Sequence, residues 1–411
     1  MPQQAPKPEE TVKILKVGHA GDGVTEDGLF VPYTVPGDVV RIAREGARAR
    51  LRDVVTPGPW RIQPPCPHFG RCGGCALQHV AREPYLQWKR DLIVAALKQR
   101  GFSDVPVEDI HAVSPGTRRR ANFKAQASRT GVLVGFYEAA SRNLVDLSEC
   151  PILVPQLARL MAPLRTHLAG LMRPNETAEL FATLTDSGVD LALKLKRARA
   201  PDLLMALSEL ASSLRLARLS WNGDDVAVAA TPIINIGRFQ VALPPDAFLQ
   251  PTKEGERFLQ SQIVTSAAKA PRLADLFSGC GTFALALAGE HAVHAVDSVA
   301  PQIEALSAAA KRGGAKLSSE VRDLFRRPLL PPELSRFDAV VLDPPRPGAA
   351  EQARALAQSA VARILYVSCN TASFARDARI LADGGYRLEC VRPLDQFLWS
   401  PHVELFAEFS R

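Results

Sequence analysis

Two predicted strand ends near the end of the chain carry residues that can do chemistry. Cys369 follows the apolar run 364–368, and Asp343 follows the apolar run 339–342 and opens an Asp-Pro-Pro-Arg sequence. In a doubly wound α/β domain, ligands bind at the carboxyl ends of the strands. A cysteine at a strand end is usually only a small apolar residue. Beside an Asp-Pro-Pro loop, however, it predicts a nucleophile next to a binding pocket.

A glycine-rich turn, residues 275–284 with the sequence DLFSGCGTFA, leaves one predicted strand and enters a helix. Its glycines let the backbone approach a ligand at a helix N-terminus. Asp297 ends the next predicted strand, where a carboxylate can accept hydrogen bonds from a ribose diol. This pattern suits a nicotinamide cofactor or S-adenosylmethionine. The rigid Asp-Pro-Pro turn favours S-adenosylmethionine, because its carboxylate and free carbonyls can bind a planar base and a dehydrogenase has no use for it.

Cys369 gains a specific role if a carboxylate lies near it. Carbon 5 of uracil or cytosine is a poor nucleophile, and thiolate addition at carbon 6 turns it into an enolate-like carbon that can attack a methyl sulfonium. A base must then remove the carbon 5 proton before the thiolate leaves. Glu404, in the strand-like run 401–406, is the best candidate for this base. The alternative is a glutamate that merely faces solvent.

Four cysteines predict a metal site. Cys66, Cys72 and Cys75 lie close together, the last two in a Cys-x-x-Cys spacing, and Cys150 precedes a proline far downstream. In a long chain without a disulfide scaffold, clustered thiols favour metal binding or catalysis. Four thiolates suit zinc or an iron–sulfur cluster. The two glycines between Cys72 and Cys75 let the backbone wrap a bulky cluster and donate N–H groups to its sulfurs.

The composition describes a globular protein of two or three domains. The chain has 411 residues, 46% of them hydrophobic, and seven cysteines; its mean hydropathy is −0.02. No apolar run approaches the roughly 20 residues of a membrane span, and the N-terminus lacks the apolar core of a signal peptide. We therefore expect a cytoplasmic, monomeric protein with no membrane contact and a disordered tail at residues 1–10.

Residues 41–129 are strongly basic, with 17 Lys and Arg against 7 Asp and Glu, a local excess of +10, whereas the whole chain carries +7. Such a patch predicts a polyanionic partner through counterion release. Nucleic acid is favoured over a solvated basic face. Its most clustered cationic residues form two groups: Arg41, Arg44, Arg48, Arg50 and Arg52 in the first, and Arg118, Arg119, Arg120 and Lys124 in the second.

Strand and helix patterns divide the rest of the chain into three parts. Residues 11–63 predict a small five-strand barrel of oligonucleotide-binding type that holds RNA. Residues 64–245 predict an α+β middle domain that carries the cysteines and binds RNA, with a helix at 82–100 that can pack on the last domain. Residues 246–411 alternate strand and helix, which predicts a parallel α/β sheet and an antiparallel C-terminal hairpin. The strands expected there are 273–277, 292–296, 338–342 and 363–367, and the helices are 282–290, 300–311, 350–359 and 372–383.

These motifs resemble those of the RNA uridine-5 methyltransferases, and specifically their 23S ribosomal-RNA branch with an N-terminal TRAM domain. The resemblance covers nearly the whole chain and rests on CGGCALQH (72–79), DLFSGCGTF (275–283), LDPPRPG (342–348), VSCN (367–370) and PHVELFAEF (401–409). It implies a Rossmann-like class I methyltransferase domain, with Cys369 as nucleophile and Glu404 as base. It implies a 4Fe–4S cluster on Cys66, Cys72, Cys75 and Cys150. Together with the glycine turn, it places S-adenosylmethionine against Gln250, Phe277, Gly279, Thr282, Asp297, Asp323 and Asp343.

The activity that the resemblance implies is methylation of carbon 5 of a uridine in 23S ribosomal RNA, with the uridine flipped toward Cys369. A transfer-RNA uridine enzyme shares the catalytic half, but its branch usually lacks the TRAM domain and the cysteine cluster. An RNA cytosine-5 methyltransferase shares the thiolate chemistry, and a non-catalytic iron–sulfur RNA-binding factor is the alternative from another class. The chain departs from the family pattern at Thr252 (commonly Asn), Asp297 (commonly Glu) and Thr371 (commonly Pro), and none of these removes a reacting group.

Overall fold

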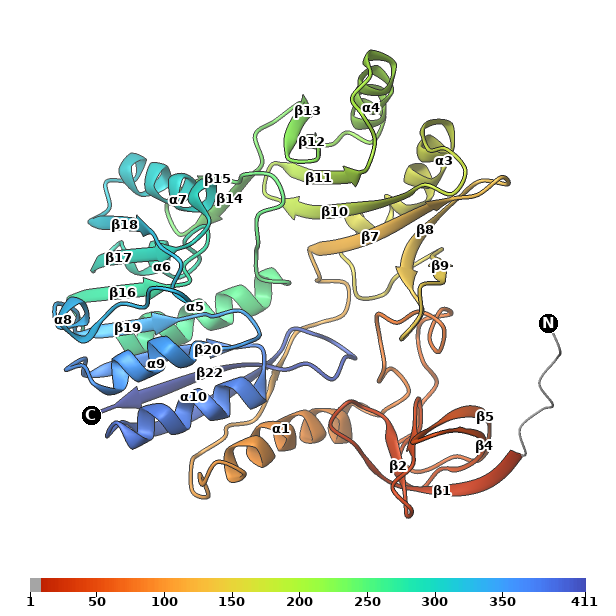
Figure 1. Cartoon of the computed structure of the whole chain (residues 1–411), viewed down its shortest axis with the longest axis horizontal. Helices are drawn as coiled ribbons and strands as arrows, with labels where there is room; N and C mark the ends of the chain where they lie inside the picture. The colour runs from red at the N-terminus through yellow and green to blue at the C-terminus, as the bar shows by residue number, and fades with distance from the viewer. Residues whose placement is uncertain (1–8) are drawn as a thin grey trace.

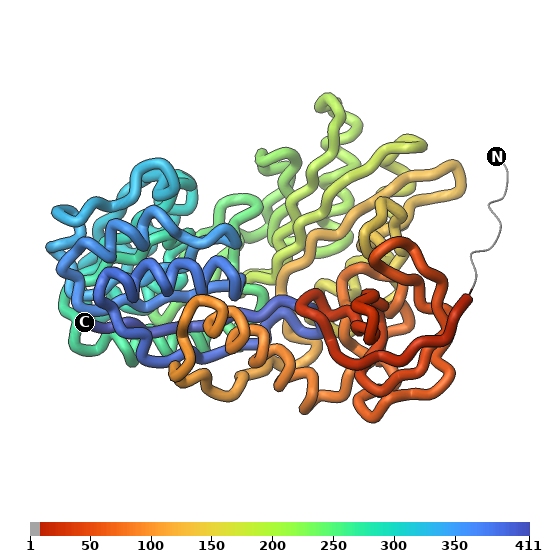
Figure 2. The backbone as a smooth tube through the Cα atoms, turned by 60° about the horizontal axis from the view of Figure 1, so that its bottom comes forward, coloured from red at the N-terminus to blue at the C-terminus, as the bar shows by residue number. Residues whose placement is uncertain are grey.

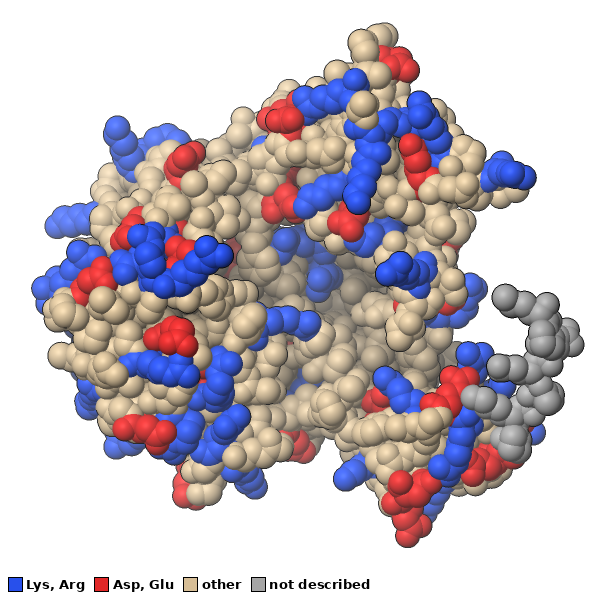
Figure 3. All heavy atoms as spheres, viewed as in Figure 1, with Lys and Arg blue, Asp and Glu red and all other residues tan. Residues whose placement is uncertain are grey.

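The computed structural model describes residues 9–411, which form three lobes around a central hollow (Figure 1, Figure 3). The first lobe is a closed barrel of five strands in the order β1-β2-β3-β5-β4, as predicted. Glu9 and Glu10, expected in the tail, already belong to β1, and residues 1–8 of that tail lie outside the described part. The barrel strands are β1 (Glu9–Val17), β2 (Gly23–Thr25), β3 (Phe30–Val31), β4 (Val39–Glu45) and β5 (Arg48–Thr56).

The five arginines of the first basic group lie on the barrel in ion pairs with its carboxylates. Most of the partner acids come from residues 9–27, outside the stretch whose charge was counted. The count along the sequence therefore overstated the positive charge of the barrel surface. The pairs are Arg41–Asp53, Arg44–Glu10, Arg44–Asp27, Arg48–Asp22, Arg50–Glu45 and Arg52–Glu9.

The second lobe is a seven-stranded sheet in the order β13-β12-β11-β10-β7-β8-β9. Helices cover one face, where alternate residues of β7 such as Phe123 are buried in the core. On the other face, Asn122 and Lys124 are only half-buried and line cavities that open to the hollow. The elements are β7 (Arg120–Ala127), β8 (Val132–Tyr137), β9 (Leu144–Asp146), α2 (Pro155–Ala158), α3 (Met161–Leu171), β10 (Thr177–Thr185), β11 (Gly188–Leu195), α4 (Pro201–Ser213), β12 (Arg218–Trp221) and β13 (Asp224–Val228).

The third lobe is built on an eight-stranded sheet in the order β18-β17-β16-β19-β20-β22-β21-β6. Its first five strands are parallel, and β22 runs antiparallel between β20 and β21. Separate apolar cores cover its two faces, which confirms the predicted α/β fold class. The elements are β6 (His111–Ala112), α5 (Lys253–Ala267), β16 (Arg272–Leu276), α6 (Ala284–Leu287), β17 (Ala292–Asp297), α7 (Ala300–Arg312), β18 (Leu317–Val321), α8 (Pro331–Leu334), β19 (Ala339–Leu342), α9 (Ala350–Ala357), β20 (Arg363–Ser368), α10 (Thr371–Asp383), β21 (Arg387–Asp395) and β22 (Glu404–Ser410).

Several elements were missed by the sequence patterns. The edge strand β18 has no buried residue and hence no apolar run to reveal it. The hairpin of β14 (Ile233–Ile236) and β15 (Phe239–Ala242) was also missed, as was α5, whose N-cap Thr252 accepts from the Gly255 N–H at 3.0 Å. The helix predicted at 282–290 is shorter in the structure, where α6 spans only Ala284–Leu287.

Helix α1 (Arg82–Lys98) lies against α10 of the third lobe rather than in the second lobe (Figure 1, Figure 2). Its Ile93 and Leu97 enter the apolar core of that lobe. After α1 the chain adds β6 to the edge of the eight-stranded sheet of the third lobe, beside β21. Residues 82–113 are therefore part of the third lobe in space. No helix within residues 9–411 is both long and apolar enough to cross a membrane.

Candidate active site

A cavity of about 770 Å³ opens at the carboxyl ends of β16, β17, β19 and β20, where the third lobe faces the hollow. Parallel strands end at the same edge of a sheet, so turns far apart in sequence meet there. All the residues predicted for catalysis and for cofactor contact line this one cavity. They are Gln250, Phe277, Gly279, Thr282, Asp297, Asp323, Asp343, Cys369 and Glu404.

The glycine turn bends sharply as it leaves β16. Phe277, Gly279 and Gly281 have φ values of 66°, 54° and 91°. A Cβ on Gly281 would stand 2.6 Å from Leu306 Cδ1, so a larger residue does not fit. The turn therefore brings main chain, rather than side chains, to the cavity wall, which is how a backbone grips a nucleoside ligand.

Two carboxylates on this wall are held by main-chain donors. Asp297 accepts from the Gly279 N–H at 3.0 Å and from the Val299 N–H at 2.9 Å. Asp323 accepts from the Phe325 N–H at 3.0 Å. An ionised carboxylate has about four lone-pair sites, so both acids keep acceptors for the hydroxyl or amino groups of a nucleoside.

Cys369 stands between β20 and α10 at the opposite wall. Asn370 caps the helix by accepting from two N–H groups at 3.0 and 3.2 Å, which fixes the turn that carries the thiol. Burial, with help from Glu404 and Asp343 and against Arg346, raises the pKa of the Cys369 thiol to about 12. The thiol of the ligand-free protein is therefore protonated at neutral pH.

A chain of side-chain amides joins the two buried acids of the site. Gln396 Nε2 donates to Glu404 Oε2 at 2.9 Å and to Gln250 Oε1 at 2.8 Å, and Gln250 Nε2 donates to Asp343 Oδ2 at 3.1 Å. Glu404 is 3% exposed, so it does not face solvent. Burial and then the charge of Asp343 raise the pKa of Glu404 well above its usual value, and burial also raises the pKa of Asp343. A carboxylate in this state readily takes up a proton.

Comparison with known proteins identifies the site. A family model described as tRNA (uracil-5-)-methyltransferase matches residues 224–407. An RNA methyltransferase of Brucella suis is 45% identical, with 97% of each chain aligned. A 23S rRNA (uracil(1939)-C(5))-methyltransferase of Chromohalobacter salexigens is 31% identical over 97% of this chain and 89% of that protein. The chain belongs to the RNA uracil-5-methyltransferase family. It is an RNA methyltransferase that depends on S-adenosylmethionine, as the family resemblance predicted.

The fold agrees with this family. The crystal structure of the tRNA (uracil-54, C5)-methyltransferase of Pyrococcus abyssi, in complex with S-adenosyl-L-homocysteine, superposes with a TM-score of 0.77. The superposition covers 97% of this chain and 99% of that one, at 23% sequence identity.

Several lining residues of the methyltransferase cavity were not predicted. Arg346 Nη2 lies 2.9 and 2.6 Å from the two ring nitrogens of His402, whose pKa burial and Arg346 lower to about 4. Phe248 is 57% exposed and stacks under the Arg120 guanidinium. Arg346 stands inside the Asp-Pro-Pro-Arg motif and could have been found there. Gln396 carries no signal of its own, because its role depends on partners distant in sequence.

The second basic group lies at the RNA methyltransferase cavity. Arg118 and Arg120 line it. Arg119 instead forms a buried ion pair with Glu256, and the two side chains are 7% and 5% exposed. The cationic side chains that line the cavity are therefore Arg118, Arg120, Arg322 and Arg346.

Three of the four predicted metal-binding cysteines, Cys66, Cys72 and Cys75, lie in the loop between β5 and α1. Cys150 follows β9 in the second lobe. A Cβ on Gly73 would stand 2.9 Å from the Tyr137 carbonyl, so this loop packs tightly on β8. Gly74 N–H donates to Cys72 Sγ at 3.4 Å. Within residues 9–411, no three His, Cys, Asp or Glu side chains are gathered as the ligands of one metal ion. The thiolates of an iron–sulfur cluster bind different irons, so they stand farther apart than the ligands of a single metal ion, and they accept hydrogen bonds from backbone N–H groups. Four cysteines are the kind of ligand set that such a cluster takes.

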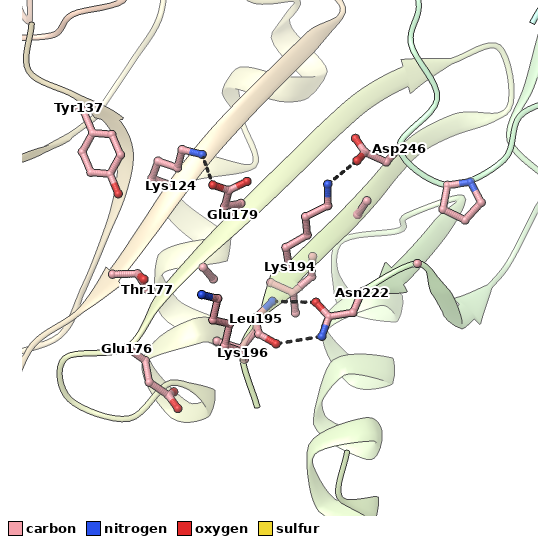
Figure 4. Close-up of a pocket in the computed structure, with 15 residues that line it drawn as sticks. Lys124, Tyr137, Glu176, Thr177, Glu179, Lys194, Leu195, Lys196, Asn222 and Asp246 are labelled. Atoms are coloured by element: carbon pink, nitrogen blue, oxygen red, sulfur yellow. Dashed lines mark hydrogen bonds and ion pairs between the residues drawn. The ribbon is translucent and has the colours of Figure 1, made fainter. Parts of the chain in front are cut away.

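A second cavity, of about 860 Å³, lies on the open face of the second-lobe sheet (Figure 4). Lys124 pairs with Glu179 at 2.7 Å, and Lys194 pairs with Asp246 at 2.6 Å. Lys196, also exposed at this cavity, has no ion-pair partner within residues 9–411. Asn122, which lines the active-site cavity, and Lys124, which lines this one, lie on the same face of β7, so both cavities lie along one face of the second-lobe sheet, which we call the track.

Proposed function

We propose that the protein methylates carbon 5 of a uridine in 23S ribosomal RNA, with S-adenosylmethionine as the methyl donor. The observation that carries the proposal is the convergence of a thiol, a buried base and a nucleoside-binding turn in one cavity. A transfer-RNA uridine and an RNA cytosine are the competing substrates, because the same thiolate chemistry serves all three. The 31% identity to a 23S rRNA methyltransferase across nearly the whole chain supports the ribosomal substrate.

The residues divide the chemistry between them. The thiol of Cys369 loses its proton to solvent, which the positive charge of a bound sulfonium would favour. The thiolate adds to carbon 6 of the flipped base, and the π electron pair of the carbon 5–carbon 6 bond moves to carbon 5. S-adenosylmethionine, when bound against Asp297, Asp323 and Asp343, supplies an electrophilic methyl group to carbon 5. Glu404 then removes the proton from carbon 5, the double bond re-forms and the thiolate leaves. The buried cavity excludes water while the covalent bond persists.

The covalent step is tested with RNA that contains 5-fluorouridine. Wild-type protein with S-adenosylmethionine should form an RNA adduct that survives denaturing electrophoresis, because fluorine cannot leave as a proton. Cys369→Ala should form no adduct and no methylated product. Glu404→Gln should still form a covalent species with ordinary uridine RNA but turn over about 10²–10⁴-fold more slowly, as loss of a general base predicts. Methylation by Cys369→Ala would overturn the mechanism.

The substrate is tested by mass-spectrometric mapping of RNA from a strain that lacks the gene. We expect one 5-methyluridine to disappear from 23S ribosomal RNA and to return on complementation. Loss of 5-methyluridine from transfer RNA, or loss of 5-methylcytidine, would replace the ribosomal assignment with one of the alternatives.

We further propose a 4Fe–4S cluster on Cys66, Cys72, Cys75 and Cys150. Protein purified without oxygen should be brown, absorb broadly near 400 nm as thiolate-bound clusters do, and contain about four irons. Cys150→Ser should lose iron. A colourless protein that binds a single zinc would contradict the cluster.

A further inference from the structure

A fully buried ion pair joins α1 to the catalytic lobe beneath the active site. Lys89 on α1 donates to Asp395 at the end of β21, and both side chains are 0% exposed. Lys89 also donates to the Phe397 carbonyl at 3.1 Å. Tyr85, one turn earlier on α1, donates its hydroxyl proton to the second Asp395 oxygen at 2.6 Å. Removing one member of such a buried network leaves the others without partners.

The connection between β21 and β22, residues 396–403, is held by the same N-terminal segment. The Tyr85 hydroxyl accepts from the Trp399 N–H at 2.8 Å. The N–H groups of residues 76 and 77 both donate to the Trp399 carbonyl, at 2.8 and 3.0 Å. Trp399 has a φ of 56°, a left-handed conformation that bulky residues rarely adopt and that its surroundings must enforce. The connection is therefore held in place by contacts from before and within α1.

Both ends of this connection place the catalytic base. Gln396 directly follows Asp395 and donates to the Glu404 carboxylate. Glu404 begins β22, where it pairs with Leu394, the residue before Asp395. A shift of Asp395 would therefore move both the strand partner and the side-chain partner of Glu404.

We propose that Lys89 and Tyr85 are positioning residues that orient the Glu404 carboxylate through Asp395 and Gln396. This inference rests on the proposed function, in which Glu404 removes the carbon 5 proton. Neither Cys369 nor the glycine turn is bonded to α1, so addition of the thiolate and transfer of the methyl group do not depend on the network. Only the final removal of the carbon 5 proton depends on the network.

Tyr85→Phe tests the proposal by deleting one hydroxyl. The substitution leaves one Asp395 oxygen and the Trp399 N–H without the hydrogen bond that each makes to Tyr85. Turnover on uridine RNA should fall about 10-fold or more, as a misplaced catalytic group predicts, while the KM for RNA stays unchanged. The methylated covalent RNA–protein species should accumulate during turnover. The rate of adduct formation with 5-fluorouridine RNA should stay within about twofold of wild type, because that adduct forms before proton removal. Lys89→Met should show the same pattern.

The matched control is Tyr366→Phe. The Tyr366 hydroxyl donates to buried Asp377 at 2.7 Å in the same lobe, but it makes no bond to residues 395–404. It should not accumulate the covalent species. Thermal melting of each variant separates folding from positioning.

Two outcomes would overturn the proposal. One is wild-type turnover in both Tyr85→Phe and Lys89→Met. The other is loss of 5-fluorouridine adduct formation in step with turnover, which indicates a general structural role. If wild-type protein itself forms no adduct, the proposed function fails instead, whatever the variants do.

Discussion

At the scale of single residues, burial first, and then the nearby acids Glu404 and Asp343, raise the pKa of the Cys369 thiol and keep it protonated. Because its pKa is raised to about 12, the thiolate fraction grows about tenfold for each pH unit below that value. Alkylation of Cys369 by iodoacetamide should therefore be slow at pH 7 and accelerate about 100-fold by pH 9. Mass spectrometry of the labelled peptide measures it, with Cys390 as an internal reference. A rate that does not change with pH would contradict this environment.

The same acids predict a difference between the two forms of the cofactor. In the proposed complex, the sulfonium of S-adenosylmethionine would bring a positive charge into the cavity that Asp343, Cys369 and Glu404 line, whereas the thioether of S-adenosylhomocysteine is neutral and of similar size. A nearby cation favours the thiolate. Alkylation of Cys369 should thus be faster with S-adenosylmethionine than with S-adenosylhomocysteine. Equal rates in the two complexes would show that the cofactor charge does not reach the thiol.

Asp343 gives a stability prediction with a defined sign. Burial raises its pKa from 3.8 to about 7, so the stability linked to its proton is present below pH 3.8 and is lost as pH rises through about 7. Above that pH the wild-type protein carries a buried charge that asparagine would not. Asp343→Asn should raise the melting temperature of the ligand-free protein by a few degrees at pH 8 and by less at pH 5. A larger gain at pH 5 would reverse the assignment.

At the scale of elements, β7 and β11 present one open face beside the catalytic cavity. The ion pairs on that face are partly exposed, and such pairs are weak. RNA phosphates can therefore compete for Lys194, while Lys196 has no ion-pair partner in the described part of the chain. We infer that the RNA around the target uridine follows this track, which would make the second lobe the RNA-binding domain predicted from the sequence. Lys194→Ala with Lys196→Ala should weaken RNA binding about 10-fold and lower the salt slope by about 2, one per phosphate contact.

The matched control for this face is Lys311→Ala on α7, which is exposed and lies outside both cavities. Its affinity and salt slope should equal those of wild type in the same fluorescence titration. If the double variant also binds RNA with unchanged affinity, the RNA does not lie on the second-lobe sheet.

The elements that carry the motifs could be predicted because their environment leaves a pattern. Strands β19 and β20 are buried on both faces, so they appear as apolar runs that are followed by Asp343 and Cys369. The half-exposed strand β18 leaves no such run. The bond of Gln396 to Gln250 joins residues 146 positions apart, and only the folded sheet brings them together. The sequence count overstated the positive charge of the barrel for the same reason, because most of the acids that pair with its arginines lie outside the stretch that was counted.

At the scale of the whole molecule, the catalytic lobe is not a continuous stretch of chain. The pattern of strands and helices set its start at residue 246, yet α1 and β6 complete its core and its sheet. The segment that contains α1 and β6, between the first and second lobes in the sequence, therefore serves two purposes. It covers an apolar surface of the catalytic lobe, and it supplies the partners of Asp395. The barrel and the loop that carries Cys66, Cys72 and Cys75 precede α1, so the first lobe is joined to the catalytic lobe through that helix.

This arrangement predicts that residues 246–411 do not fold alone. The fragment would expose the apolar surface that Ile93 and Leu97 cover, and Asp395 would lose its partners Lys89 and Tyr85. A domain of this size is stable by only about 5–15 kcal/mol. Circular dichroism should show no cooperative melting for the fragment, whereas a fragment that starts at residue 82 should melt cooperatively. Cooperative melting of 246–411 at the temperature of the longer fragment would show that α1 only rests on the surface of the lobe.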